Sequence, residues 1–239
     1  MKKLFLASTA FLLLQHITAQ VKEGVITYEQ KIDMYRRIPE DNAQLRSMMP
    51  QFRTSKYELQ FADSQTLFKA AEEEPDMTQQ NNGGVVMRFG GAENEYYRNF
   101  SKKWAVEKRD LMEDSYLVED SIHSLVWKLE DAETKTILGY PCKKASGKSE
   151  RGNDIVAWYT EEIPLSGGPD QFNGLPGMIL CIDANKGEIV FTATVINKKV
   201  DAKKIKAPAK GKKISSADFA KKQKELLGNQ PGGVRIVTN

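Results

Sequence analysis

Several residue types that define small functional classes are scarce in this chain of 239 residues. Two cysteines and two histidines are too few for a Cys/His-rich zinc module or a disulfide-knotted miniprotein. No apolar run reaches the ~18 residues of a membrane-spanning helix, which excludes a multi-pass membrane protein. With 35 basic and 32 acidic residues, the formal charge of +3 gives the whole chain no strong preference for polyanions. A hydrophobic content of 40% nevertheless predicts a folded core in one large domain, or in one domain with a tail.

The first 19 residues have the layout of a bacterial secretory signal peptide. Met1, Lys2 and Lys3 give a positive start, residues 4–17 are mostly apolar, and Ala19 precedes the expected cleavage point. The apolar stretch is too short for a stable membrane anchor. We therefore expect an exported protein, periplasmic or envelope-associated, that has no nucleic-acid partner and is not an integral membrane protein.

Export changes the interpretation of Cys142 and Cys181, because disulfides persist in oxidising compartments. The sequence is equally compatible with a bridge between these cysteines and with two buried free thiols in neighbouring strands. Neither has an evident catalytic partner, because His123 is the sole histidine after the signal peptide and lies in a polar stretch between predicted strands.

Charge is unevenly distributed along the chain. Residues 197–239 contain 12 basic and three acidic residues, a formal charge of +9, whereas residues 20–196 have a formal charge of −8. The lysine-rich stretch 198–214 is predicted to be an extended, solvated linker. In the last segment, 215–239, Ser216 is predicted to cap a helix over 217–227. This tail either contacts an anionic surface or a partner, or simply folds back on its own acidic body.

The body, residues 20–197, has the pattern of a mainly β protein. Short runs rich in Val, Ile, Thr and aromatic residues recur between turn residues, which indicates an antiparallel meander. So many strands do not form a stable flat sheet, so we expect a curled antiparallel sheet or half-open β-barrel with one or two short helices. Residues 41–49 are predicted to form a helix and 72–84 a long hairpin loop. The predicted strands cover residues 24–32, 56–61, 66–69, 85–89, 95–100, 104–108, 115–119, 125–129, 136–138, 142–145, 154–160, 178–182 and 189–195.

Four short motifs occur in order between residues 139 and 179. They are Gly139-Tyr140-Pro141-Cys142, Ala157-Trp158-Tyr159-Thr160, Ile163-Pro164-Leu165 and Gly174-Leu175-Pro176-Gly177-Met178-Ile179. Together with Gly24-Val25-Ile26-Thr27-Tyr28, they resemble the GLPGLI family of exported Gram-negative envelope proteins, with Met178 in place of the leucine. The resemblance covers roughly residues 24–198 and implies an exported, β-rich domain. It brings no established activity and no catalytic residues.

The Pro176-Gly177 pair suits the centre of a type II turn, because Pro fixes φ and Gly tolerates a positive φ. Residues 161–177 are predicted to form a rigid loop over one end of the sheet, either as a plug that closes the core or as the lip of a ligand groove. Aromatic side chains would line such a groove, although ordinary core packing also explains them. The candidate binding residues are Trp104, Trp127, Trp158, Tyr159, Leu175, Pro176, Gly177 and Met178.

These observations favour a non-catalytic exported envelope protein that binds an apolar ligand or an envelope partner, in a carrier or accessory role. One alternative is an assembly or interaction partner of an outer-membrane complex that binds no small ligand. A hydrolase that uses scattered carboxylates is a further alternative. The sequence contains no phosphate-binding glycine loop, nucleophile elbow or metal-ligand spacing, so we expect no catalytic residues, metal or cofactor.

Overall fold

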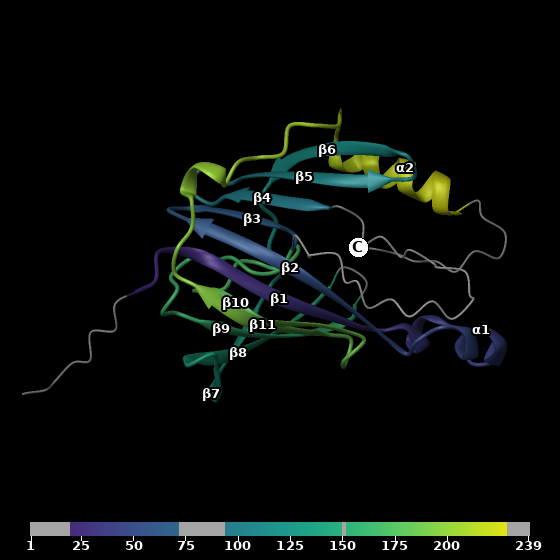
Figure 1. Cartoon of the computed structure of the whole chain (residues 1–239), viewed down its shortest axis with the longest axis horizontal. Helices are drawn as coiled ribbons and strands as arrows, with labels where there is room; N and C mark the ends of the chain where they lie inside the picture. The colour runs from purple at the N-terminus through teal and green to yellow at the C-terminus, as the bar shows by residue number, and fades with distance from the viewer. Residues whose placement is uncertain (1–19, 72–93, 150–151, 229–239) are drawn as a thin grey trace, which may run out of the picture.

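A computed structural model describes residues 20–71, 94–149 and 152–228 (Figure 1). The predicted signal peptide, the loop 72–84, the strand 85–89 and residues 229–239 lie outside these ranges. The strands are β1 (Glu23–Asp33), β2 (Phe52–Ala62), β3 (Gln65–Ala70), β4 (Glu95–Asn99), β5 (Trp104–Leu111), β6 (Asp114–Ser121), β7 (Lys128–Ile137), β8 (Tyr140–Lys148), β9 (Asp154–Thr160), β10 (Met178–Ala184), β11 (Ile189–Asn197) and β12 (Lys212–Ile214). The helical segments are η1 (Met34–Arg37), α1 (Ala43–Met48), η2 (Ala202–Lys204) and α2 (Ser216–Gly228).

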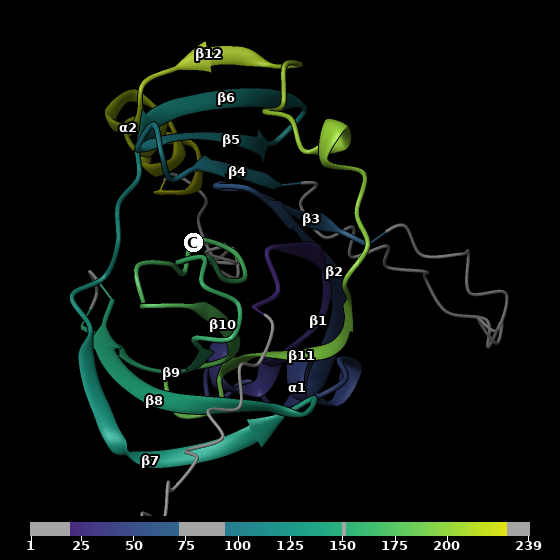
Figure 2. The ribbon, with the colours of Figure 1, turned by 90° about the vertical axis from the view of Figure 1, so that its left-hand side faces the viewer.

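The strands of the described residues form one 12-stranded sheet, in the order β12-β6-β5-β4-β3-β2-β1-β11-β10-β9-β8-β7. Neighbouring strands pair antiparallel, except that β12 lies parallel to β6. The sheet curls so that β6 and β7 face each other across an opening, which the segment between them crosses (Figure 2). β7 and β12 form its two edges. The predicted fold class, a mainly β protein with a curled and unclosed sheet, is confirmed.

The curl separates an inner face, which contains the main core, from an outer face. In β1, Ile26 and Tyr28 are fully buried and alternate with partly exposed residues, as expected when one face of a strand packs inward. Leu59 and Phe61 of β2 continue this core across the sheet. β10 is instead almost continuously buried, which is typical of a strand covered on both faces.

Two strands differ from the prediction. Residues 128–129 of the expected strand 125–129 and residues 136–137 of the expected strand 136–138 belong to one strand, β7, whereas residues 125–127 lie in no strand. The pairing of β7 with β8 is irregular between Glu130 and Thr134. Residues 131–133 have the polar character of a turn, and for this reason the sequence predicted two strands where the structure has one. The second difference is β12, whose sequence Lys-Lys-Ile has no apolar alternation to predict it.

The basic tail is part of the folded unit. Val200, Ile205 and Ala207 pack against a cluster on the outer face that includes Leu67 and Tyr97, so the prediction of a solvated linker was wrong. The tail then adds β12 to the edge of β6. Three apolar contacts separated by lysines are too sparse to form a recognisable sequence pattern.

Helix α2 lies on the inner side of β5 and β6 (Figure 2). Phe219 is its buried anchor and packs against Tyr116 and Val118. The cap is Ser215 rather than the predicted Ser216: its hydroxyl accepts a hydrogen bond from the Asp218 N–H at 3.1 Å. Within the described chain, none of the helices has the length and apolar character needed to cross a membrane.

Candidate functional site

Residues 161–177, here called the plug segment, fold against the inner face of the sheet. Ile163 and Leu175 are fully buried in the main core. Backbone hydrogen bonds join Met178 N–H to the Ile163 carbonyl at 3.0 Å and Ile179 N–H to the Gly167 carbonyl at 2.9 Å. The segment therefore packs as a plug against the sheet.

The Pro176-Gly177 turn differs from the predicted type II turn. Gly177 is not among the residues with a positive φ, and its N–H donates to the Leu175 carbonyl at 2.7 Å, which closes a three-residue turn around Pro176. Glycine is required here by close packing, because a Cβ at this position would lie 2.1 Å from the Thr160 carbonyl oxygen.

Asn173 links the plug segment to the crossover between β6 and β7. Its side-chain amide donates to the His123 carbonyl at 2.9 Å and its Oδ1 accepts from the Ser124 hydroxyl at 2.5 Å. The Trp127 indole N–H donates to the Asn173 carbonyl at 2.8 Å. These contacts join the two segments at the open side of the curled sheet.

A polar cluster lies where the plug segment meets β4 and β5. Arg98 is 4% exposed, and its Nη1 donates to the Asp170 carbonyl at 2.8 Å. Its Nη2 lies 3.9 Å from the Glu107 carboxylate, which is 3.6 Å from Arg109 Nη1. The Tyr96 hydroxyl is hydrogen-bonded to the Asp170 carboxylate. We call these five residues the Asp170 cluster.

The Asp170 cluster contains an acid with unusual titration behaviour. Burial raises the pKa of the Asp170 carboxyl to about 6, although the hydrogen bond from Tyr96 favours the charged form. The Oδ1 atom is buried and has no hydrogen-bond partner among the described residues. Such an acid can take up a proton near neutral pH, but its hydrogen bonds attach the plug segment to the sheet.

The predicted aromatic site is spread over several environments. Trp158 and Tyr159 are consecutive in β9, so their side chains lie on opposite faces of the sheet. Trp104 packs against the separate cluster on the outer face that contains Ile205. Among the other candidates, Tyr159, Leu175, Gly177 and Met178 are buried, Trp127 is partly buried and Pro176 is exposed. Within the described residues, the eight candidates do not line one shared hollow.

Cys142 and Cys181 are buried free thiols, so the bridge considered from the sequence is absent. Cys142 lies on β8 and Cys181 on β10, with β9 between them. Strands two positions apart are separated by roughly 9.6 Å, beyond the ~7 Å Cα separation that a disulfide tolerates. Burial raises the pKa of the Cys142 thiol to about 11, which makes it a poor nucleophile.

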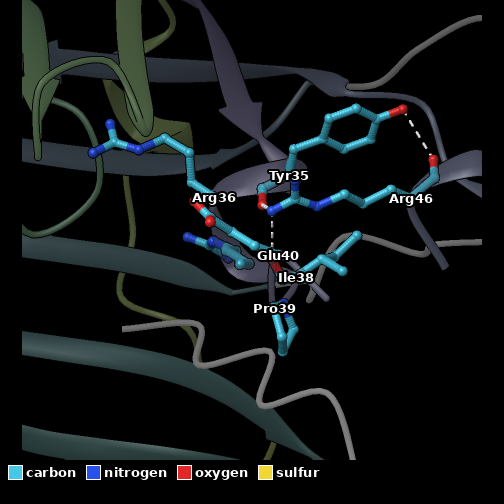
Figure 3. Close-up of a pocket in the computed structure, with 7 residues that line it drawn as sticks. Tyr35, Arg36, Ile38, Pro39, Glu40 and Arg46 are labelled. Carbon is cyan, nitrogen blue, oxygen red and sulfur yellow. Dashed lines mark hydrogen bonds between the residues drawn. The ribbon is translucent and has the colours of Figure 1, made fainter. Parts of the chain in front are cut away.

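An open pocket of about 570 Å³ lies beside η1 and α1 (Figure 3). Arg46 Nη2 donates to the Ile38 carbonyl at 3.0 Å, and the Tyr35 hydroxyl donates to the Arg46 carbonyl at 2.9 Å. Arg36 extends away from the Arg46 guanidinium and donates to the Lys186 carbonyl at 2.9 Å. Arg46 therefore holds α1 against η1 within the β1–β2 connection, and Arg36 links that connection to the β10–β11 turn.

The sequence did not predict the Asp170 cluster. Arg98 and Asp170 are 72 positions apart, and Asp170 is one of many acidic residues in the chain. The available signal was the alternation of Tyr96 and Arg98 with Tyr97 and Asn99 in β4, which places an arginine on a buried face. The described residues contain no group of three or more Cys, His, Asp or Glu side chains arranged to hold a metal ion.

Comparisons with solved structures relate this fold to part of PNGF-II. Among curated proteins, no sequence is similar to this chain. A structure of PNGF-II in space group P21 is 16% identical, with a TM-score of 0.58 over 86% of this chain and 34% of that chain. A second PNGF-II structure, in space group C2, is 16% identical, with a TM-score of 0.56 over 84% of this chain and 32% of that chain.

The PNGF-II comparison applies to part of that protein, because this chain spans about a third of its length. A third structure, an uncharacterized conserved protein from Thermus thermophilus, is 6% identical, with a TM-score of only 0.41 over 82% of this chain and 91% of that chain. Residues 101–221, just over half of the chain, match the family model described as the N-terminal domain of N-glycanase peptide, and the protein therefore belongs to this family.

Proposed function

We propose that this protein is a non-catalytic, exported binding module whose partner is a macromolecule of the cell envelope. The observation that carries the proposal is the packing of the inner face. The plug segment and α2 occupy the side of the sheet where an apolar carrier would hold its ligand. Outer surfaces and loops are then the parts available for recognition, which favours a large partner over a small apolar ligand.

The Asp170 cluster supports the non-catalytic assignment. A carboxylate-based hydrolase needs acids that reach a substrate in a cleft. Asp170 is instead hydrogen-bonded to Tyr96 within the fold, and its backbone carbonyl accepts from Arg98. A structural role for this acid explains its burial without any reaction.

Export is the second part of the proposal. Its support is the signal-peptide layout of residues 1–19 and the resemblance of residues 24–198 to the GLPGLI family of exported envelope proteins. Both arguments come from the sequence. Fractionation of cells that produce the full chain tests them: the mature protein is expected in the periplasm or envelope, beginning at Gln20.

Native mass spectrometry of the mature protein, purified gently from the periplasm, tests whether it carries a small ligand. We expect the bare mass of the chain. A reproducible extra mass of a few hundred daltons, lost on extraction with organic solvent, would contradict the macromolecular partner and favour an apolar carrier.

The family match favours a more specific candidate, the recognition of glycoproteins. Its members are N-terminal domains of N-glycanase peptide, and we propose that this chain binds proteins that bear N-linked glycans. Immobilised N-glycosylated protein should bind the chain more tightly than the same protein after enzymatic removal of its glycans. Equal binding to both forms would exclude the glycan as the recognised group.

A separate experiment with a glycopeptide tests for catalysis. After long incubation with a glycopeptide, mass spectrometry is expected to find the glycan intact. Release of glycan by the wild-type chain would overturn the non-catalytic assignment. Loss of that release in Asp170→Asn would then identify Asp170 as a residue that the reaction needs.

A further inference from the structure

The folded part of the tail places a dense group of lysines on the outer surface. Residues 198–213, here called the basic strap, contain eight lysines and Asp201 as their charged residues, a formal charge of +7. All eight lysines are exposed. Such a concentration of one charge differs from the rest of the chain, whose acidic residues outnumber the basic ones.

The strap is held in place by its apolar residues. Ile205 is 4% exposed and packs against Leu67 and Tyr97 on the outer face. Asp201 caps η2 by accepting the Lys203 N–H at 3.1 Å, and β12 then fixes the far end of the strap on β6. In Figure 2 the strap is the yellow-green segment that passes outside β3 towards β12. Its lysines therefore project from a folded surface.

Few of these charges are neutralised by the protein. Lys212 Nζ lies 2.7 Å from Asp114 and Lys213 Nζ lies 2.9 Å from Glu119. In the part of the chain that the structure describes, the other six lysines have no ion-pair partner, namely Lys198, Lys199, Lys203, Lys204, Lys206 and Lys210. Like charges so close together repel one another, and an external array of anions would relieve this repulsion.

We propose that the basic strap docks the protein on an anionic lipid surface through the phosphate groups of the lipids. Lysine presents a hydrated point charge that suits diffuse attraction to many phosphates, whereas the strap lacks the arginine that favours bidentate recognition of a single group. Ile205 is buried in the fold, so it is not available to insert into the bilayer. The attachment is peripheral and sensitive to salt. This inference does not depend on the proposed function.

Sedimentation with lipid vesicles tests the proposal. We expect the mature protein to bind vesicles with about one third phosphatidylglycerol in phosphatidylcholine, and to leave vesicles of phosphatidylcholine alone unbound. Binding should be strong at about 0.05 M NaCl and lost at about 0.5 M. Glutamine in place of the six unpaired lysines should lower the partition coefficient at least about 100-fold, because each lysine near the surface adds to the attraction.

A matched variant separates the strap from net charge. It replaces six exposed lysines elsewhere by glutamine, namely Lys22, Lys56, Lys128, Lys186, Lys221 and Lys224. This control should keep most of the binding, and arginine at the six strap positions should also keep it. Thermal unfolding of every variant confirms that the fold is retained.

Three outcomes would overturn the proposal. The first is an absence of wild-type binding to the anionic vesicles. The second is an equal loss of binding in the strap and control variants. The third is displacement by inorganic phosphate at constant ionic strength, which would indicate a discrete phosphate site in place of a lipid surface.

Discussion

Asp170 combines two features that are unfavourable in isolation. Its backbone has φ of 53°, in the left-handed region, and its carboxylate Oδ1 is buried without a hydrogen-bond partner among the described residues. Contacts with Tyr96 and Arg98 hold it in place. Asp170 therefore lowers local stability through its backbone angle and its Oδ1, unpartnered within the described chain, while its contacts fix the plug segment on the sheet.

Replacing Asp170 by Asn should make stability less dependent on pH. The folded-state pKa of about 6 is above the ordinary value of 3.8, so between these values the folded protein holds a proton that the unfolded chain releases. Stability contributed by this carboxyl therefore rises as pH falls from about 7 to about 4, and above that window its charge is a constant penalty. Urea unfolding should find Asp170→Asn about 2–3 kcal/mol more stable at pH 7.5, with most of this difference lost near pH 4.

Asp63→Asn is the control for this prediction. Asp63 has the same φ of 53° but is exposed, so asparagine suits its backbone equally well. Its replacement should leave the pH profile unchanged. If the difference in unfolding free energy between the wild type and Asp170→Asn stayed constant between pH 4 and 7, Asp170 would not be the titrating group.

Sequence and structure diverge in an instructive way at Gly177. The dipeptide Pro-Gly predicted a type II turn from local backbone preferences, whereas a three-residue turn forms around Pro176. The need for glycine comes instead from Thr160, whose carbonyl would lie 2.1 Å from an added Cβ. A contact between two segments therefore requires glycine at position 177, and turn preferences derived from neighbouring residues do not predict such a contact.

At the scale of secondary-structure elements, the two sheet edges are both protected. β7 has an irregular pairing between Glu130 and Thr134 and is rich in charged residues, which hinders the addition of another strand. β6 would be an open edge, but β12 covers it. The tail thus covers the edge of β6 with a strand of its own.

Deletion of residues 198–239 should destabilise the body. Loss of Ile205 and its neighbours exposes the apolar cluster on the outer face, and loss of β12 and Phe219 uncovers β6 on its edge and inner face. We expect a loss of about 3 kcal/mol or more in thermal unfolding, and self-association by light scattering.

The shorter deletion of residues 229–239 is the comparison, because it keeps β12 and α2. Because the tail packing is kept, this variant should unfold at a higher temperature than the long deletion. If the long deletion also unfolded like the full mature chain, the packing of the tail would contribute nothing to stability. For the same reason, a test of partner binding cannot simply remove the tail, and surface substitutions are preferable.

Elements with a clear apolar alternation were predictable from sequence, as β1 and β9 illustrate. Their boundaries and faces follow from the period of two in a half-buried strand. β12 was not predictable, because its three residues, two lysines and Ile214, take their strand conformation from pairing with β6. The Asp170 cluster was missed for a similar reason. The local sequence of the plug segment and that of β4 do not show that these two distant segments contact each other.

For the molecule as a whole, the twelve-stranded order fixes the relation between the two thiols. β9 separates the strands of Cys142 and Cys181, and both side chains are buried. We expect the mature protein to show the mass of a dithiol and to react with Ellman's reagent only after denaturation. After denaturation the reagent should titrate both thiols.

A protein whose mass corresponds to a disulfide, and which forms one species on non-reducing electrophoresis, would contradict this arrangement of strands. Cys142→Ala serves as the comparison, because it leaves one thiol to titrate in denaturant. Its folded form should remain as unreactive as the wild type.

The pairing of β1 with β11 has a further consequence for the order of events during folding. Val25 lies opposite Asn197, so the first strand finds one of its partners near the end of the body. The meanders β1–β6 and β7–β11 consist of neighbours in sequence and can form early, whereas the pairing of β1 with β11 that joins them closes a very long loop. During synthesis the N-terminus appears first, so β1 can pair only with β2 until residue 197 is available. In that interval the other edge of β1 is open to binding by a chaperone.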